Sequence, residues 1–318
     1  MKKVKQVSVI IPTHKRPEAL LDALTSINMQ TVKPLEVIVV NDGGYQQTIQ
    51  ALKTFQPEGF ALLLENVSEA KGACLARNLG AASAKGEILM FLDDDDTWEP
   101  GKVRSQLMKF EESEEIGLVY SGKLVVNDSD REKVIRVILP EKRGRLYPEI
   151  YFDNLLGTTS SVAIKKELFE KVGGFDVNLP AMQDYDLWIR CSKHTFIEHD
   201  DACHVRYTIA DNPNHQISGK SDNHKKAVSY LMKKYKSELN TLGRKVKKRF
   251  CSSRYMHLSK AVHRRSYGES LKYSIKSFWY RPNWRAAALF LPPMALNLVN
   301  KVVYQSMKPI QERGRKLS

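Results

Sequence analysis

The chain has 318 residues, of which 42% are hydrophobic and 27% charged, so its composition is that of a folded globular protein. Its formal net charge is +14, because residues 241–318 hold 18 Lys and Arg against two acids, whereas the first 240 residues hold 32 against 34. The four cysteines form no C-x-x-C pair and no run of about 18 apolar residues occurs, which argues against a zinc knot, a disulfide framework and a membrane-spanning helix. We therefore expect a cytoplasmic protein whose basic C-terminal part suits nucleic acid or an anionic membrane surface.

The first hundred residues alternate between short apolar runs and segments with helical spacing. Such alternation predicts a mostly parallel sheet with right-handed crossovers. The segment 71–86 is rich in small residues, which predicts a tightly packed helix. Buried strands are expected at 7–11, 36–40, 61–65 and 87–92, and helices at 17–29, after residue 44 and at 71–86.

Polar residues follow three of these strands at the point where each strand ends. PTHKR follows the first strand, NDGG follows the second, and the four aspartates of residues 93–96 follow the fourth. In sheets of this kind, ligands bind at the carboxyl ends of the strands. We therefore expect the three segments to meet on one edge of the sheet and to form the binding site.

Beyond Trp98 the pattern is less regular. Strands are expected at 117–122 and 133–139, and residues 158–175 predict a strand, a helix and a glycine stop. Residues 179–193 show an amphipathic helical pattern with acids near its start. The predicted organisation is a catalytic domain at 1–225, with a nucleotide-binding half at 1–98 and an acceptor-side half at 99–225, followed by a basic helical extension at 226–318.

Four consecutive aspartates require neutralisation, because carboxylates held together disfavour one another's ionisation. Asp96 or Thr97 would cap a helix predicted after Pro100, but capping accounts for only one or two acids. Hard divalent cations bind carboxylate oxygens, and Mg²⁺ leaves coordination positions for substrate phosphates. The run therefore predicts a metal–phosphate site.

Two common phosphate-binding motifs do not fit this chain. No G-x-G-x-x-G follows the first strand, which argues against a dinucleotide fold. The segment GLVYSGKL at 117–124 has glycines and a lysine spaced like a P-loop, but Leu124 stands where the magnesium-binding hydroxyl is required. We interpret this segment as an ordinary strand.

Five segments, in this order, are more specific as a set: VSVIIPTHKRP, EVIVVNDGG, A-R-N-x-G at 76–80, FLDDDD, and GGFD with QDYDLW. Together they resemble family 2 of the inverting glycosyltransferases over about residues 5–220. The resemblance implies the GT-A fold, which is Rossmann-like α/β with a mostly parallel sheet flanked by helices. It also implies transfer from a nucleotide-sugar, expected to be a UDP-sugar, in bacterial cell-surface polysaccharide biosynthesis, with Mg²⁺ or Mn²⁺ as cofactor.

The resemblance also assigns roles to individual residues. Asp42 corresponds to the aspartate that holds the nucleotide base, Asp93 lies near the ribose, and Asp95 ligates the metal on the diphosphate. Asp96 either assists or caps a helix. The residues expected to contact the nucleotide-sugar are Pro12, Thr13, His14, Arg16, Asp42, Arg77, Asn78, Asp93 and Asp94.

Inversion requires one base, which removes the proton of the acceptor hydroxyl as its oxygen attacks the sugar. The family usually has E-D-x-D where this chain has QDYD, and the first aspartate of that motif, here Asp184, is the implied base. Gln183 replaces the usual Glu, so no role is transferred to that position. The alternative interpretation of Asp184 is an acid at a helix N-terminus. Asp186 and Trp188 are expected to orient the helix or shape the pocket.

The histidines carry weaker signals. His215 and Ser218, in NHQIS, resemble a late H-x-x-S element that closes over the donor, so His215 is a second candidate metal ligand or diphosphate contact. His194, His199 and His204 are expected to be surface or packing residues.

The C-terminal part leaves two interpretations open. Residues 281–308 combine an apolar stretch, a tryptophan and flanking cations, interrupted by Pro292 and Pro293. This segment either lies in a membrane interface with aromatic anchors or packs as a helical hairpin on the catalytic body. The partners expected are a nucleotide-sugar, a glycan or lipid-linked acceptor and a membrane surface bound through the basic region, on the inner face of the cell membrane. No nucleic acid is expected, and an oligomer stays open.

Two rival functions remain to be weighed. A sugar-phosphate nucleotidyltransferase would use the same aspartate–metal–nucleotide chemistry, but the chain lacks the glycine-rich N-terminal signature it needs. A non-enzymatic nucleic-acid-binding protein would use the basic tail and lose affinity steeply with salt, but no recognition motif is present.

Overall fold

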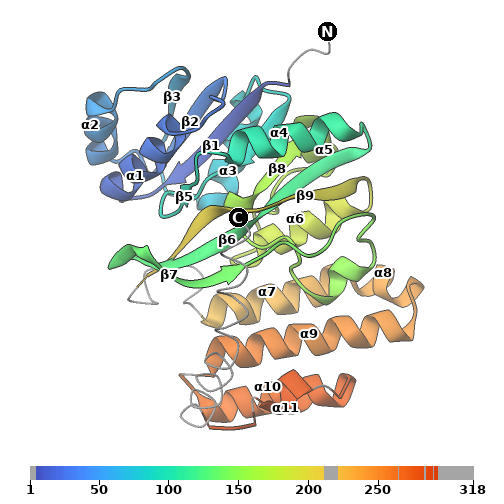
Figure 1. Ribbon diagram of the computed structural model, residues 1–318. Coiled ribbons are helices and arrows are strands. Elements are labelled where there is room, and N and C mark those ends of the chain that lie inside the picture. Colours follow the sequence, from blue (N-terminus) through green and yellow to red (C-terminus); the bar gives the residue numbers. More distant parts are fainter. Residues whose placement is uncertain (1–4, 211–220, 264, 283, 289, 293–318) are drawn as a thin grey trace. The chain divides into compact units, whose positions relative to one another are not determined.

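The structure, a computed structural model, describes residues 5–210, 221–263, 265–282, 284–288 and 290–292. The chain divides into two compact units, Met1–Gln216 and Ile217–Ser318. The first unit is an α/β sheet with its helices, and the described part of the second is helical (Figure 1).

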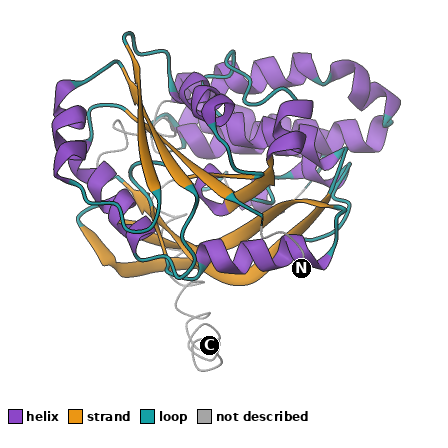
Figure 2. Cartoon of the chain, turned by 90° about the horizontal axis from the view of Figure 1, so that it is seen from above, coloured by secondary structure: helices purple, strands orange, loops and turns teal. Residues whose placement is uncertain are grey.

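The first unit is built on a nine-stranded sheet in the order β3-β2-β1-β4-β8-β6-β9-β5, with β7 paired to β6. Neighbouring strands are parallel from β3 to β4, as the alternating pattern predicts. Figure 2 shows the strands, in orange, fanning across the view with the twist expected of such a sheet. The strands are β1 (Val7–Thr13), β2 (Glu36–Asp42), β3 (Ala61–Val67), β4 (Ile88–Phe91), β5 (Thr97–Trp98), β6 (Ile116–Asn127), β7 (Asp130–Ile138), β8 (Val162–Lys165) and β9 (Phe196–Ile209).

Side chains of β1 alternate between the two faces of the sheet, as strand geometry requires. Val9 and Ile11 pack in a core shared with helices α1 (Pro17–Asn28) and α4 (Lys102–Glu112). Ile10 faces helix α3 (Ala73–Ser83), where a Cβ added at Gly80 would lie only 2.6 Å from its Cγ2 atom. The tight packing predicted for the small-residue helix is therefore confirmed.

The second half of the sheet is mixed. β8 runs antiparallel to both β4 and β6, whereas β9 runs parallel to β6. The sequence analysis did not predict β9, because acids and histidines interrupt its apolar residues. The remaining helices of this unit are α2 (Gln46–Thr54), η1 (Glu149–Phe152), η2 (Thr159–Ser161), α5 (Lys166–Lys171) and α6 (Gln183–Ser192).

The second unit confirms the helical prediction for the basic region. Its helices are α7 (Ser221–Lys234), α8 (Lys236–Thr241), α9 (Arg244–Val262), α10 (Tyr267–Tyr280) and α11 (Trp284–Ala288). In the part of the chain that the structure describes, no helix is both long enough and apolar enough to span a bilayer. Most of the expected interfacial segment 281–308 lies outside the described residues.

Candidate active site

The ends of β1, β2 and β4 meet on one edge of the sheet. Thr13, at the end of β1, donates its hydroxyl to Asp94 Oδ2 at 2.8 Å. His14 Nδ1 lies 2.7 Å from the backbone carbonyl oxygen of Asp42, at the end of β2. The three polar segments that follow these strands are thus brought together, as the topology predicts.

Two arginines neutralise the aspartate run. Arg16 Nη1 lies 2.6 Å from Asp95 Oδ2 and 3.2 Å from Asp94 Oδ1. Arg77, from α3, forms a short ion pair with Asp93. The Arg77 guanidinium also lies 5.4 Å from the centre of the Phe175 ring, and this cation–π contact helps to fix the position of the guanidinium.

The four aspartates differ in their surroundings. Asp94 is buried, and this burial raises its pKa to about 6, although Arg16 opposes the rise. Asp96 is also buried, which raises its pKa, and the charges of Asp95 and Asp93 add to that effect. Asp93 and Asp95 remain partly accessible. These two carboxylates are therefore the ones available to a ligand.

The interpretation of Asp96 or Thr97 as a helix cap is wrong. Helix α4 begins after Gly101, and no side chain caps its first turn. Asp96 instead accepts from the Ser160 hydroxyl at 2.6 Å and from the backbone N–H of Thr208 at 3.0 Å. Asp96 therefore ties the aspartate run to η2 and β9.

Two residues predicted to contact the nucleotide, Asp42 and Asn78, form hydrogen bonds within the protein. Asp42 accepts the backbone N–H groups of Lys71 and Gly72, each at 2.8 Å, and so holds the loop before α3. Asn78 exchanges two 2.9 Å hydrogen bonds with the backbone of Phe175. Both side chains shape the walls of the site through these contacts, and Pro12 is buried within β1.

Asp184 lies in the first turn of α6 and belongs to the same site. Asn154 Nδ2 donates to Asp184 Oδ2 at 2.9 Å. Burial raises the pKa of Asp184, while hydrogen bonds and the charges of Lys123 and Arg77 oppose the rise. Since Arg77 also pairs with Asp93, one guanidinium acts electrostatically on both ends of the site.

Three functional candidates were missed by the sequence analysis: Asn154, Lys123 and Tyr207. The Asn154 amide also donates to the backbone oxygen of Gly157 at 3.1 Å, which fixes its orientation toward Asp184. Lys123 Nζ lies 4.6 Å above the Tyr207 ring and interacts electrostatically with Asp96 and Asp184. Among the described residues, Lys123 Nζ makes no hydrogen bond, so its charge is available to the site.

Lys123 belongs to the segment that resembles a P-loop. That segment is the strand β6, as interpreted from its sequence. Its lysine nonetheless reaches the site, because β6 lies beside β9 in the sheet. Only the strand order could have revealed this.

The orienting role expected of Asp186 and Trp188 agrees with their contacts. Asp186 is buried and accepts from Arg190, which also donates to the backbone oxygen of Val172 at 2.6 Å. The Trp188 indole N–H donates to Gly157 O at 3.3 Å. The Trp188 bond holds α6 against the loop that carries Asn154, and the Arg190 bond holds it against the end of α5.

The residues at this edge fit a divalent cation held by few protein ligands. Among the described residues, no group of three or more His, Cys, Asp or Glu is arranged to hold a metal. Asp95 offers a carboxylate whose partner Arg16 has a side chain 44% exposed, and an ion pair at such exposure is weak. Mg²⁺ typically uses one or two carboxylates and takes its other ligands from phosphates and water. The second candidate ligand, His215, lies outside the described residues.

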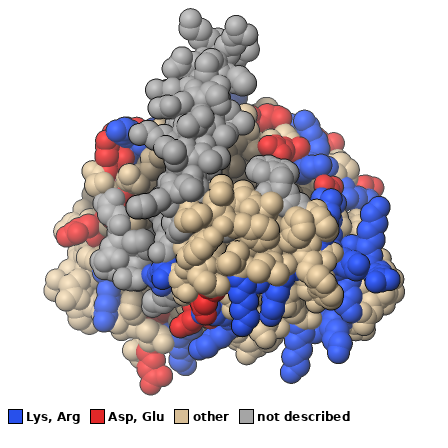
Figure 3. Space-filling model, turned by 90° about the horizontal axis from the view of Figure 1, so that it is seen from below, with Lys and Arg blue, Asp and Glu red and all other residues tan. Residues whose placement is uncertain are grey.

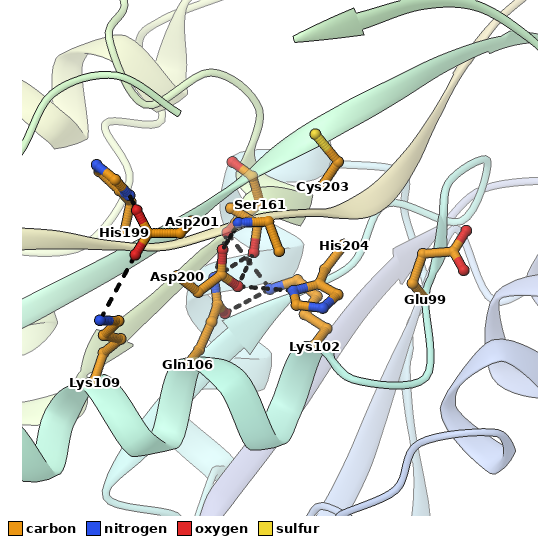
Figure 4. A network of polar contacts seen from close by, with 12 residues as sticks. Glu99, Lys102, Gln106, Lys109, Ser161, His199, Asp200, Asp201, Cys203 and His204 are labelled. Atoms are coloured by element: carbon orange, nitrogen blue, oxygen red, sulfur yellow. Dashed lines mark hydrogen bonds and ion pairs between the residues drawn. The ribbon is translucent and has the colours of Figure 1, made fainter. Parts of the chain in front are cut away.

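A second polar cluster lies between α4 and β9 (Figure 4). Lys102, which is fully buried, donates to Gln106 Oε1 at 2.6 Å. Gln106 donates to Ser121 Oγ at 3.0 Å, and Ser121 donates to Asp200 Oδ2 at 2.6 Å. His204 Nδ1 lies 2.9 Å from the same Asp200 oxygen. We call this cluster of Lys102, Gln106, Ser121, Asp200 and His204 the Lys102 network, and its polar groups bind one another.

The Lys102 network supports the packing role expected of His204. Burial, with a contribution from Asp200, raises the pKa of the neighbouring Cys203 thiol to about 11, which disfavours its reactive thiolate form. His199 is likewise buried, in line with a packing role.

Comparison with known proteins adds a family to this geometry. The model of a family described as Glycosyl transferase family 2 matches residues 8–173. An uncharacterized glycosyltransferase of Haemophilus influenzae is 28% identical over 231 residues, covering 72% of this chain and 76% of that protein. The amylovoran biosynthesis glycosyltransferase AmsB of Erwinia amylovora is 29% identical over 196 residues, covering 59% of this chain and 64% of that protein.

Solved structures agree at the level of the fold. Residues 1–349 of Staphylococcus aureus TarS in complex with UDP-GlcNAc match with a TM-score of 0.56 and 14% identity, covering 89% of this chain and 90% of that one. The complex of the same protein with UDP matches with a TM-score of 0.55 and 13% identity, covering 87% and 92%.

Proposed function

Since this chain belongs to glycosyl transferase family 2 and is a glycosyltransferase, we propose that it moves a sugar from a UDP-sugar to a hydroxyl group with inversion at the anomeric carbon. The observation that carries the proposal is the joint placement of the aspartate run and Asp184 around Arg77. One end offers carboxylates and arginines for a metal-bound diphosphate, and the other offers a base.

The donor is assigned to the edge formed by β1, β2 and β4. Thr13 binds the buried Asp94, Arg16 bridges Asp94 and the partly accessible Asp95, and His14 contacts the carbonyl oxygen of Asp42 at the same edge. Arginine and backbone groups of this kind recognise phosphate oxygens. The two TarS structures are complexes with UDP and UDP-GlcNAc, which supports a uridine nucleotide for this chain as well.

Asp95, with Asp93 beside it, is proposed to hold Mg²⁺ or Mn²⁺. A bound divalent cation would stabilise the charge that develops on the departing diphosphate. Arg16 moves from Asp95 to the diphosphate when the donor binds, because its exposed ion pair costs little to break. Arg16 thus neutralises Asp95 before the donor binds and neutralises the diphosphate afterwards.

Asp184 is proposed as the base of a single displacement. The acceptor oxygen forms a bond to the anomeric carbon, the bond between that carbon and the diphosphate oxygen breaks, and the acceptor proton passes to the Asp184 carboxylate. Asn154 fixes Oδ2 of Asp184, and Lys123 favours its charged form. Both contacts keep a buried carboxyl group ready to take a proton.

The acceptor is proposed to be a glycan or lipid-linked saccharide of a cell-surface polysaccharide. The name of AmsB, a relative assigned to amylovoran biosynthesis, supports this class. The second unit, rich in Lys and Arg, is proposed to bring the enzyme to the inner face of the cell membrane, where such an acceptor would be carried.

The proposal is tested with the full chain and a panel of UDP-, GDP-, CMP- and dTDP-sugars. Binding is measured by calorimetry with and without Mn²⁺, and transfer by release of the free nucleotide in the presence of oligosaccharide acceptors. We expect tight binding of a UDP-sugar only with the metal. Metal-independent binding, or a preference for another nucleotide, would overturn the corresponding part of the proposal.

A further inference from the structure

Helices α9 and α10 pack through serine hydroxyls. Ser252 Oγ lies 3.1 Å from Ser277 Oγ and donates to the Ser277 carbonyl oxygen at 2.9 Å. Ser259 Oγ lies 2.8 Å from Ser270 Oγ and 2.7 Å from Ser274 Oγ. All five serines are buried. Small residues allow two helices to approach closely, and their hydroxyls bind one another across the interface.

The opposite face of α10 is apolar and exposed. Trp279 is 78% exposed, Ile275 is 54% exposed and Phe278 is 38% exposed. A helix on the surface of a water-soluble protein normally turns its apolar face to the core and its polar face to solvent. In α10 the arrangement is reversed, since small hydroxyl residues face the partner helix and large apolar residues face outward. Ile275 and Trp279 are the most exposed of these, whereas the Phe278 ring lies 6.0 Å from the Phe290 ring.

Cations lie beside this outward face, and the Lys276 ammonium is 5.3 Å from the centre of the Tyr255 ring on α9. Lys272, Lys276 and Arg281 are exposed on α10 or directly after it. Residues 244–281 contain 12 Lys and Arg but a single acid, Glu269, whose carboxylate pairs with Lys225 at 2.9 Å. Figure 3, which views the molecule from below, shows Lys and Arg side chains below and to the right of an uncharged surface, with a few acids among them.

We infer that the outward face of α10, formed by Ile275, Phe278 and Trp279 with Lys272, Lys276 and Arg281, binds an anionic lipid surface. Aromatic side chains favour the region between headgroups and acyl chains. Each Lys or Arg near an anionic surface adds attraction. The inference specifies the membrane contact of the proposed function and rests on that part of it.

Two other occupants fit less well. A second copy of this face would bring two strongly positive surfaces together, which is unfavourable. Nucleic acid would satisfy the cations, but an aliphatic side chain such as Ile275 gains nothing from a phosphate backbone. A lipid surface satisfies both the charges and the apolar side chains.

The test is co-sedimentation of the full chain with vesicles of phosphatidylcholine alone or mixed with phosphatidylglycerol. We expect binding to the mixed vesicles. The double variant F278S/W279S should bind them about tenfold or more weakly, because two large apolar side chains no longer enter the interface. The double variant K272Q/K276Q should bind about thirtyfold more weakly at low salt and recover relative to wild type at high salt.

Met108→Ser on α4 and Lys53→Gln on α2 serve as matched controls, since both side chains are exposed in the first unit. They should leave vesicle binding unchanged. Equal binding by F278S/W279S and wild type, or no binding of wild type to anionic vesicles at low salt, would overturn the inference. The inference would also be overturned if wild type were an oligomer and F278S/W279S a monomer, because the face would then bind a second copy. It would likewise be overturned if the variants lost binding to an oligonucleotide and kept binding to vesicles.

Donor binding by calorimetry separates this inference from the proposed reaction. The α10 variants should bind a UDP-sugar as wild type does, because they leave the aspartate site intact. If wild type binds anionic vesicles but no nucleotide-sugar, the reaction is wrong and the lipid surface stands. If the reverse holds, the lipid surface is wrong and the reaction stands.

Discussion

Two lysines of the first unit have similar surroundings but different partners. Lys102 Nζ lies 4.6 Å above the ring of Trp98, and Lys123 Nζ lies 4.6 Å above the ring of Tyr207. Burial lowers the pKa of both ammonium groups. Lys102 is bound within its network by Gln106, whereas Lys123 Nζ makes no hydrogen bond to a described residue.

The difference separates a structural cluster from a functional one. In the Lys102 network, the polar groups of α4, β6 and β9 are satisfied by one another, so the network adds specificity to the packing. At the aspartate edge, exposed Arg16 neutralises Asp95 and nearby Lys123 acts on Asp184 at a distance. Such loosely paired charges are available to a ligand.

Asp95→Asn should have the largest effect, because it removes the proposed metal ligand from the aspartate edge. A neutral amide binds a hard cation poorly. Calorimetry should show that Mn²⁺-dependent binding of the nucleotide-sugar is lost. Asp128→Asn, at an exposed acid in the turn between β6 and β7, is the control. Unchanged Mn²⁺-dependent affinity in Asp95→Asn would assign the metal elsewhere.

Asp184→Asn should leave binding intact and slow transfer. The amide keeps the size of the side chain and its hydrogen bond to Asn154 can be rearranged, but it takes no proton. We expect kcat to fall by about 10²–10⁴ while nucleotide affinity stays near that of wild type. Parallel loss of binding and transfer would mark Asp184 as a structural acid of α6.

Most of the first unit could be predicted from the sequence. The family and the GT-A fold are confirmed, and the apolar runs before PTHKR, NDGG and the aspartates correspond to β1, β2 and β4. These strands are buried on both faces, so their sequences are continuous apolar runs. β9 could not be predicted, because Glu198, His199 and Asp200 are buried in it and interrupt the pattern.

The candidate site could be predicted only where it follows strand ends. The alternation of strands and helices places Thr13, Asp42 and Asp93 on one edge, and the structure shows them there. The contribution of Lys123 and Asn154 depends on β8 and β6 following β4 in the sheet. That order arises from contacts between residues far apart in the chain, which no local spacing records.

Lys123→Met tests the role of the loosely paired lysine. Its positive charge lowers the pKa of Asp184, so its loss should raise that pKa. Because the base must be deprotonated, the acid limb of kcat/KM should move to higher pH. Lys123→Arg should restore the wild-type profile, and Lys133→Met, at an exposed lysine of β7, should not alter it. An unmoved acid limb in Lys123→Met would remove Lys123 from the mechanism.

Lys102→Met tests the Lys102 network through the pH dependence of stability. The pKa of Lys102 is about 7 in the folded protein because of burial, against 10.5 for an ordinary lysine. Between these values the unfolded chain binds a proton that the folded chain does not, so the free energy of unfolding of wild type should rise with pH by up to about 1.4 kcal/mol per unit. Below pH 7 both states are protonated and this contribution is constant.

Denaturant unfolding of wild type and Lys102→Met at several pH values between 6 and 9 measures that contribution. The difference between the two unfolding free energies should grow with pH above 7 in favour of wild type. Parallel curves would show that the Lys102 ammonium is not forced toward neutrality by its burial.

Lys109→Met should have the smallest effect and sharpens the same comparison. Lys109 lies two turns after Lys102 on α4 and pairs with Glu112 at 2.9 Å and with Asp201 at 3.8 Å. Its partners are exposed, and hydrogen bonding to Glu112 raises rather than lowers its pKa. Exposed ion pairs of this kind contribute roughly 0.5 kcal/mol, and salt screens them. We expect unfolding free energies within that range of wild type, with no growth of the difference between pH 7 and 9. The two lysines share a helix and a neighbouring strand, β9, so a large or pH-dependent loss in Lys109→Met would show that proximity to β9, and not burial, sets the behaviour of Lys102.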